Sequence, residues 1–315
     1  MLYLQLLAGL VLLFLGGEAL VRGAVAVARR LRVSELVIGL ILVGFGTSTP
    51  ELMTSIDAAL AGAPGLALGN VIGSNVANVL LIMGVAAVIT PMRTSRAAFM
   101  RDGSVLLGST ILLVAACMFD VIGRLVGLAF LGLLLAYVGF TYLSERRQEV
   151  TGQIYAAEAD LMASPAVPGL GAALLITLLG LIGVLVGAKV LVGAAIQIAR
   201  IWQVSEAVIG LSVVAIGTSL PELATIVVAA WRRQADVAFG NIVGSNIFNT
   251  LGILGTTALV RPLDVPAQVA DFDVWVMLGV TLFLVGFAIT GWRVIRAEGL
   301  ALLFAYVAYI VVMYA

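Results

Sequence analysis

Residues Gly46 to Leu52 read GTSTPEL, and they interrupt an apolar stretch that runs from Val33 to Ala61. Pro50 has no N–H to donate, and its ring collides with the carbonyl four residues earlier, so a helix here must break or kink. The break leaves backbone oxygens unpaired beside a carboxylate and several hydroxyls. Oxygen atoms of this kind are the ligands that hard cations such as Na⁺ and Ca²⁺ prefer. The stretch therefore predicts either a cation site at a broken helix or a kink whose polar groups are satisfied within the protein.

A second copy of this stretch begins at Gly217 and reads GTSLPEL, 171 residues after the first. The same offset relates GNVIGSNVANVL, which begins at Gly69, to GNIVGSNIFNTL, which begins at Gly240. Over residues 33–52 and their counterparts, 14 of 20 positions are identical, which shared apolar composition does not explain. The chain is therefore an internal duplication.

The composition predicts an all-α membrane protein with several spans. Of the 315 residues, 62% are hydrophobic and 11% are charged, so the apolar share is well above that of soluble domains. The balance of 17 basic and 17 acidic residues does not indicate nucleic-acid binding, and the lack of histidine excludes imidazole metal ligands. The single Cys117 excludes a disulfide framework. Because no nucleophile with a neighbouring base can be proposed, we expect no enzymatic activity and no cofactor.

We expect ten transmembrane helices, because ten apolar segments are long enough to cross about 30 Å of hydrocarbon. They lie near residues 2–28, 34–62, 66–89, 98–119, 121–143, 169–198, 204–230, 236–259, 271–291 and 297–314. Five fall in a first repeat over 1–143 and five in a second over 169–315, joined by a polar cytoplasmic linker over 144–168. An odd number of spans per repeat inverts the second repeat, which is the architecture of secondary transporters, with broken helices at the centre.

The orientation follows from the basic residues. The first span begins without basic residues and is followed by Arg29, Arg30 and Arg32, which predicts an uncleaved span whose N-terminus lies outside. Ten spans then place twelve arginines on the cytoplasmic side and three outside. We therefore expect a multi-pass protein of the cell (inner) membrane with both termini outside.

The second duplicated stretch puts a serine and an asparagine on one helix face, four residues apart, in each half. These are Ser74 with Asn78 and Ser245 with Asn249. Because the pair occurs twice, we interpret all four as ligands of an ion. For the other asparagines of the two stretches we favour packing between helices. They are Asn70, Asn75, Asn241 and Asn246.

Charged and capping residues outside these motifs have structural interpretations. Ser34 followed by Glu35 is typical of a helix start. Glu18 in the first span has two candidate partners: Arg22, one turn later, and Lys189, its counterpart in the second repeat.

Together the two duplicated motifs resemble the paired alpha-repeats of the Na⁺/Ca²⁺ exchanger family, prokaryotic type, within the cation/Ca²⁺ exchanger superfamily. The resemblance covers both halves of the chain. It implies that Glu51 and Glu222 are acidic ligands shared by Ca²⁺ and Na⁺. It further implies hydroxyl, amide and backbone oxygen ligands at Thr47, Ser48, Thr218, Ser219, Ser74, Ser245, Asn78, Asn249, Gly44 and Ala215. In the K⁺-dependent branch, and in some prokaryotic members, an aspartate matches Asn249, so the asparagine disfavours K⁺ coupling here.

The function that the resemblance implies is a secondary antiporter that exchanges Na⁺ for Ca²⁺ by alternating access in the lipid bilayer, working as a monomer. The family's mechanism is sliding of the first and sixth helices as a pair across the static remainder. Glycines at 9, 16, 17, 23, 180, 183, 187 and 193 would permit that sliding. Two alternatives stay open: H⁺/Ca²⁺ exchange at the same carboxylates, and a cation channel, which would need no counter-ion.

Overall fold

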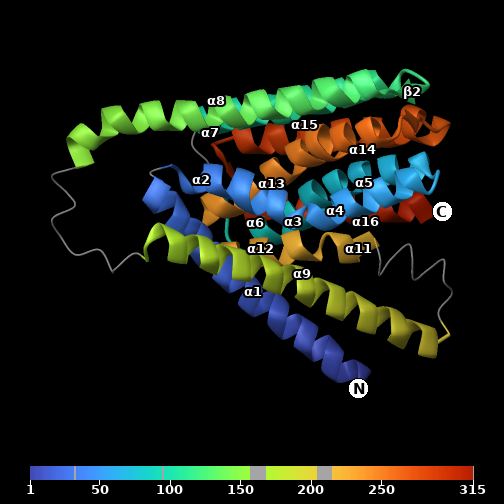
Figure 1. Cartoon of the computed structure of the whole chain (residues 1–315), viewed down its shortest axis with the longest axis horizontal. Helices are drawn as coiled ribbons and strands as arrows, with labels where there is room; N and C mark the ends of the chain where they lie inside the picture. The colour runs from blue at the N-terminus through green and yellow to red at the C-terminus, as the bar shows by residue number, and fades with distance from the viewer. Residues whose placement is uncertain (32, 94–95, 157–167, 204–214, 315) are drawn as a thin grey trace.

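The computed structural model describes residues 1–31, 33–93, 96–156, 168–203 and 215–314, and helices make up most of it (Figure 1). In the described residues, seven helices are long and apolar enough to cross a membrane, and the bent pair Glu35–Thr47 and Thr49–Leu60 makes an eighth if it is one span. Leu220–Trp231 is a shorter apolar helix, and the first part of its predicted span, 204–214, lies outside the described residues. The chain is therefore an all-α, multi-pass membrane protein, and the count of ten spans stays a prediction.

The described elements follow a similar order in the two halves, except that η5 occurs only in the second and the positions equivalent to α2 and most of η1 lie outside the described residues. The first contains α1 (Leu2–Leu31), α2 (Glu35–Ile38), η1 (Gly39–Gly44), α3 (Phe45–Thr47), α4 (Thr49–Leu60), α5 (Pro64–Ala77), η2 (Asn78–Ile82), α6 (Met83–Ile89), β1 (Met92–Arg93), α7 (Arg96–Cys117), β2 (Val121–Ile122) and α8 (Arg124–Ala156). The second contains α9 (Leu170–Ile201), α11 (Ala215–Thr218), α12 (Leu220–Trp231), α13 (Ala235–Ile247), η4 (Phe248–Ile253), α14 (Leu254–Val260), β3 (Leu263–Asp264), η5 (Val269–Asp273), α15 (Val274–Ile289), β4 (Arg293–Val294) and α16 (Arg296–Tyr314). Helix α8 continues past residue 143 into the predicted linker, of which 157–167 lie outside the described residues.

Both predicted helix breaks are present, at Ser48 and at its counterpart Ser219. Ser48 has φ −81° and ψ 10° and separates α3 from α4, and the helical stretch Glu35–Thr47 is bent by 43° against α4. Ser219 has φ −89° and ψ 6° and separates α11 from α12. Pro50 and Pro221 each fall in the first turn of the helix that follows, where an N–H would have no intrahelical acceptor. Proline therefore starts a new helix in both halves.

The carbonyl that Pro50 cannot reach is satisfied locally. The Thr49 hydroxyl donates to the Gly46 carbonyl at 2.8 Å, and the Thr49 side chain is exposed. This threonine therefore stabilises the break.

At the start of the same region Ser34 caps α2 by accepting a hydrogen bond from the Val37 N–H at 3.3 Å, which confirms its predicted role.

Wider, π-helical turns occur at equivalent places in the two halves. The segment η2 begins at Asn78, and η4 includes Asn249 as its second residue. A third π segment, η1, precedes the first break. Turns of this kind are often found at functional sites because they re-aim side chains within a helix. Apolar periodicity does not reveal them.

Two short antiparallel strand pairs join the halves. Strand β1 pairs with β4, with Met92 opposite Val294, and β2 pairs with β3, with Val121 opposite Asp264. Under the internal repeat β1 corresponds to β3 and β2 to β4, so the two pairs are equivalent to one another. The connections after the third and ninth predicted spans therefore meet at one place, and those after the fourth and eighth meet at another.

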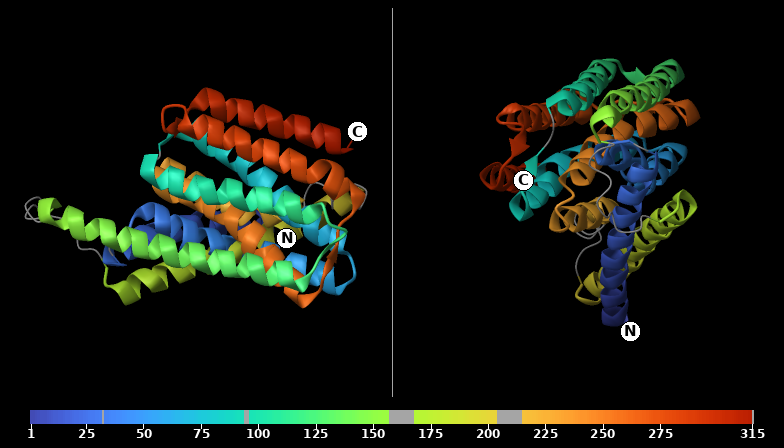
Figure 2. Two further views of the ribbon diagram at one scale, coloured as in Figure 1. Left: turned by 90° about the horizontal axis from the view of Figure 1, so that it is seen from above. Right: turned by 90° about the vertical axis from the view of Figure 1, so that its left-hand side faces the viewer.

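Helices α1 and α9 pack on each other and project from the other helices (Figures 1 and 2). Their backbones approach so closely that a Cβ on Gly16 would lie 2.6 Å from the Val184 nitrogen, and one on Gly180 2.3 Å from the Leu20 nitrogen. Glycines that face the partner helix in this way are those at 9, 16, 23, 180, 183 and 187. These six glycines therefore allow α1 and α9 to touch, and the sliding of the pair across the remainder stays a prediction.

Glu18 binds two arginines. It pairs with Arg22 on its own helix, as predicted, and it accepts a hydrogen bond from Arg232 Nε, beyond the end of α12, at 2.8 Å. Lys189, the other candidate partner, is exposed to the surroundings. The pair with Arg232 therefore fastens α1 to the end of α12.

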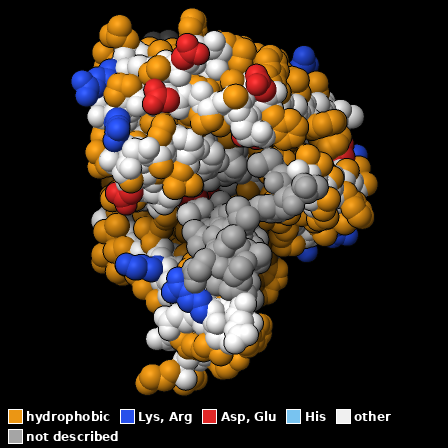
Figure 3. Space-filling model, turned by 90° about the vertical axis from the view of Figure 1, so that its right-hand side faces the viewer, with side chains coloured by type: hydrophobic (Ala, Val, Ile, Leu, Met, Phe, Trp, Pro, Cys, Tyr) orange, Lys and Arg blue, Asp and Glu red, His pale blue; other side chains and the backbone are white. Residues whose placement is uncertain are grey.

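The surface agrees with a membrane setting. Hydrophobic side chains cover much of the face shown in Figure 3, and the charged side chains occur singly or in small groups. In contrast, α13 is buried at every residue from Val237 to Ile247, its C-terminal end. The segment that carries the second duplicated motif therefore lies at the centre of the protein.

Candidate ion-binding site

One acidic side chain from each half lies just after each helix break. Glu51 is in the first turn of α4 and Glu222 in the first turn of α12, and each is only 1% exposed. The two carboxylates are close enough to interact with one another. No arginine or lysine in the described part of the chain forms an ion pair with either of them. Two buried carboxylates without a basic partner favour a cation between them.

Hydroxyl side chains at each break interact with the carboxylate of the opposite half. Ser48 Oγ donates to Glu222 Oε1 at 2.9 Å, and Thr47 also interacts with Glu222. In the same way Ser219 interacts with the Glu51 carboxylate. This crossing brings the two duplicated motifs, which are far apart in sequence, into one site.

The Gly44 carbonyl meets the same site from the last turn of η1. It accepts hydrogen bonds from Thr47 Oγ1 at 3.3 Å and from Ser245 Oγ at 3.2 Å. The contact depends on close packing, because a Cβ on Gly244 of α13 would lie 2.1 Å from the Leu40 carbonyl oxygen. Glycine at this position is therefore what allows η1 and α13 to touch.

The asparagines of the second motif form a crossed pair of hydrogen bonds. Asn78 Nδ2 donates to Asn246 Oδ1 at 2.9 Å, and Asn249 Nδ2 donates to Asn75 Oδ1 at 3.1 Å. Asn75 Nδ2 in turn donates to Thr250 Oγ1 at 3.0 Å. The prediction that Asn75 and Asn246 join helices is confirmed by these bonds between the two halves.

Four buried oxygen atoms at equivalent positions accept no hydrogen bond from any described residue. They are Glu51 Oε2, Glu222 Oε2, Asn78 Oδ1 and Asn249 Oδ1. A buried acceptor without a partner costs about 1–3 kcal/mol, and such groups are few in folded proteins. Carboxylate and amide oxygens are ligands that Ca²⁺ takes, so a bound cation would satisfy acceptors of this kind.

The structure brings most of the predicted ligands together. The contacts above join Gly44, Thr47, Ser48, Glu51, Ser219, Glu222 and Ser245 into one cluster. Asn249 follows Ser245 by one turn in the same segment. Ser74 is buried one turn before Asn78, and Ala215 and Thr218 are the first and last residues of α11. Their part as ligands stays a prediction.

The site is poor in charge for a metal centre. The described residues include no group of three or more histidine, cysteine, aspartate or glutamate side chains that could hold a metal ion. Two carboxylates with neutral oxygens suit reversible binding of an ion, because the number of charged ligands sets how tightly such an ion is held.

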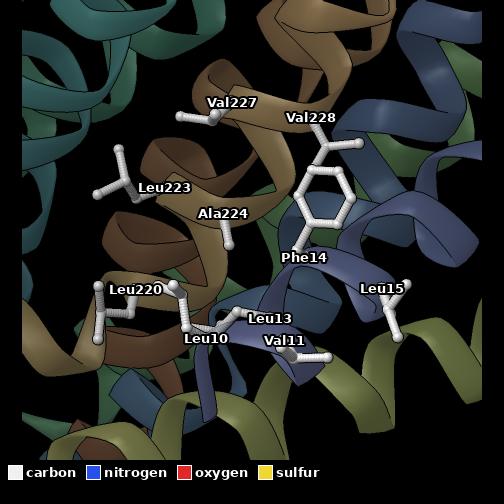
Figure 4. A pocket seen from close by; sticks show the side chains of 10 residues that line it. All are labelled: Leu10, Val11, Leu13, Phe14, Leu15, Leu220, Leu223, Ala224, Val227 and Val228. Atoms are coloured by element: carbon white, nitrogen blue, oxygen red, sulfur yellow. The ribbon is translucent and has the colours of Figure 1, made fainter. Parts of the chain in front are cut away.

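The cavity in Figure 4 is a different place. It has a volume of about 540 Å³ and lies between α1 and α12, with apolar walls that include Leu10, Phe14, Leu220 and Val228. Apolar walls cannot replace the water shell of an ion. This cavity is therefore not the ion site.

Known proteins resemble the chain over nearly its whole length. The family model described as sodium/calcium exchanger protein matches residues 1–143 and 172–315. The chain is 36% identical to the sodium/calcium exchanger MaX1 of Methanosarcina acetivorans, over 99% of this chain and 98% of that protein. It is also 36% identical to the putative antiporter CaxA of Alkalimonas amylolytica, over 96% and 95%.

Solved structures agree with these matches. A structure of the sodium-calcium exchanger NCX_Mj, soaked with zero Na⁺ and Ca²⁺, superposes with a TM-score of 0.84 at 32% identity, covering 98% of this chain and 97% of that one. A second structure of the same exchanger, soaked with Na⁺ and Sr²⁺, gives a TM-score of 0.82 and covers 99% of each chain. The chain therefore belongs to the sodium/calcium exchanger protein family.

Proposed function

We propose that this protein is an antiporter that exchanges Na⁺ for Ca²⁺ across the cell membrane. The observation that carries the proposal is the set of four buried oxygens, two from carboxylates and two from amides, that have no hydrogen-bond donor among the described residues. Relatives named as sodium/calcium exchangers share the family, and NCX_Mj shares the fold.

Charge at the site favours competition between the two ions. Glu51 and Glu222 contribute two negative charges, which one Ca²⁺ neutralises and which three Na⁺ exceed by one. Because both kinds of ion use the same carboxylates, either one displaces the other. Such competition couples the outward movement of Ca²⁺ to the inward movement of Na⁺ when the site changes sides only with an ion bound.

The membrane arrangement that we propose has ten spans in two inverted repeats of five, with both termini outside. The two equivalent strand pairs support it, because inverted repeats place the connections after the third and ninth spans on one side and those after the fourth and eighth on the other. A single chain supplies carboxylates from both halves, which supports function as a monomer.

The alternating access that we propose uses α1 and α9 as a moving pair. Their glycine contacts make them one unit, and they project from the other helices (Figure 2). Gly46 and Gly217, which flank the two breaks, lie against side chains of α9 at Leu181 and Val192. A shift of the pair would therefore move side chains that contact the segments carrying the ligands.

Ion flux through purified protein in liposomes tests the proposal. We expect ⁴⁵Ca²⁺ uptake when the liposomes are loaded with Na⁺ and the outside is free of it, and no uptake when K⁺ replaces Na⁺. Uptake driven by a proton gradient without Na⁺ would instead establish H⁺/Ca²⁺ exchange. Uptake that needs no counter-ion would establish a channel.

A further inference from the structure

Asn75 and Asn246 occupy equivalent positions in the two halves and were not expected to take part in ion binding. Each accepts a hydrogen bond from the NH₂ group of one amide ligand of the opposite half, whose oxygen is unpaired. Asn246 accepts from Asn78, and Asn75 accepts from Asn249. Asn75 and Asn246 are 4% and 1% exposed, so water does not compete for these bonds.

An asparagine amide can serve a cation in only one of its two orientations. Its oxygen attracts the ion, whereas its NH₂ group, which carries partial positive charge, repels it. The two orientations differ by a half-turn about the last side-chain bond, and little in the side chain itself prefers one of them. A partner that only accepts from the NH₂ group therefore decides which atom faces the ion.

The acceptors are themselves held in place. Asn75 Nδ2 donates to Thr250 Oγ1 at 3.0 Å and lies 3.5 Å from Met277 Sδ, which can only accept, so Asn75 Oδ1 is left to receive the Asn249 amide. Asn246 Nδ2 is directed at the Asn75 carbonyl at 3.5 Å, so Asn246 Oδ1 is left for Asn78. The network therefore turns the NH₂ groups of both ligands away from the unpaired oxygens.

We propose that Asn75 and Asn246 are positioning residues of the ion site, each fixing the ligand amide of the opposite half with its oxygen toward the ion. This inference rests on the proposed function, since it assumes that the ions bind at Asn78 and Asn249. The crossing has a consequence: a ligand on one half is oriented by the other half, so neither half can form a competent site alone.

Crossed double-mutant cycles test this role through the Ca²⁺ dissociation constant of the full-length protein in detergent, measured by ⁴⁵Ca²⁺ equilibrium binding. Asn246→Leu is close in size and removes the acceptor, so we expect at least tenfold weaker Ca²⁺ binding. Combined with Asn78→Ala, it should weaken binding no further than Asn78→Ala alone, because the amide that it orients is gone. When Asn246→Leu is combined with Asn249→Ala, the fold increases in the Ca²⁺ dissociation constant caused by the two substitutions should multiply.

The opposite pairing is expected for the other half: Asn75→Leu should couple with Asn249→Ala and be independent of Asn78→Ala. Thr257→Val is the matched control, since Thr257 is a buried polar residue whose hydroxyl bonds within its own helix, to the Ile253 carbonyl at 2.7 Å. We expect its Ca²⁺ dissociation constant to equal that of the parent. If a leucine variant does not fold, the smaller Asn→Ala variants at 75 and 246 remove the same acceptors and carry the same expectation.

Melting temperatures without Ca²⁺ separate the positioning role from a structural one. A structural role would lower the melting temperature and leave the crossed coupling absent. Multiplying losses in all four combinations, or unchanged Ca²⁺ binding in the single variants, would overturn the inference. Absence of Ca²⁺ binding by the parent would instead overturn the proposed function.

Discussion

Glu222→Gln removes one of the two charges at the site while keeping the shape of the side chain. Glutamine still offers an oxygen to the Ser48 hydroxyl, which lies 2.9 Å from Glu222 Oε1, so the packing around the break should persist. The charge is only 1% exposed, and losing one partner of a buried charge pair costs about 3–5 kcal/mol. At about 1.4 kcal/mol per tenfold, the affinity for Ca²⁺ should fall by roughly 10² to 10³ or more.

The loss should be smaller for Na⁺, because a monovalent ion gains half the Coulomb energy of a divalent one from the same carboxylate. The assay is equilibrium ⁴⁵Ca²⁺ binding, with competition by Na⁺, to purified protein of unchanged melting temperature. Glu51→Gln should behave alike, since it is the equivalent residue of the other half. Asp57→Asn, an exposed residue on the same helix as Glu51, is the matched control. Ca²⁺ affinity within a factor of about three of the parent in both glutamine variants would refute the assignment, because that is less than 1 kcal/mol.

Three further predictions concern packing, charge and orientation. Gly180→Ala would put a Cβ 2.3 Å from a backbone atom of α1, so we expect a lower melting temperature, from about 1–3 kcal/mol of overpacking, and slower exchange, whereas Gly193→Ala, with nothing within 4 Å, should match the parent. Asn249→Asp adds a third carboxylate, so protons should compete with Ca²⁺ and transport should fall more steeply than in the parent from about pH 8 to about pH 6; superimposable profiles would contradict this. In a cysteine-free background, Asp120→Cys and Ala297→Cys should react with an impermeant reagent from opposite sides of the membrane, and labelling of both from one side would exclude the inverted arrangement.

Features that depend on a residue's own helix, or on the internal repeat, could be predicted from the sequence. Pro50 and Pro221 predict the two breaks because a missing N–H and a bulky ring act on the residue's own helix. The internal repeat predicts that Glu51 and Glu222 are equivalent, and the structure places the two side chains close together and buried.

Contacts between the two halves could not be predicted from the sequence. The crossed bonds of Asn75 and Asn246 depend on the rotation of α5 against α13, which apolar periodicity does not determine. Glu18 likewise binds Arg232, not its repeat counterpart Lys189, because the partner of a charged side chain depends on how α1 packs on α12. The π segments at Asn78 and Asn249 also could not be predicted, because the spacing of apolar residues was interpreted in terms of regular α-helices.

The central claim is that one cation sits among the four unpaired oxygens. Anomalous diffraction from crystals of the purified protein grown with Ca²⁺ and without Na⁺ tests it most directly. We predict a Ca²⁺ peak about 2.3–2.6 Å from oxygens of Glu51 and Glu222, with Asn78 or Asn249 completing the shell. The peak should disappear when Na⁺ replaces Ca²⁺. A Ca²⁺ peak elsewhere, or none between the two carboxylates at saturating Ca²⁺, would contradict the account.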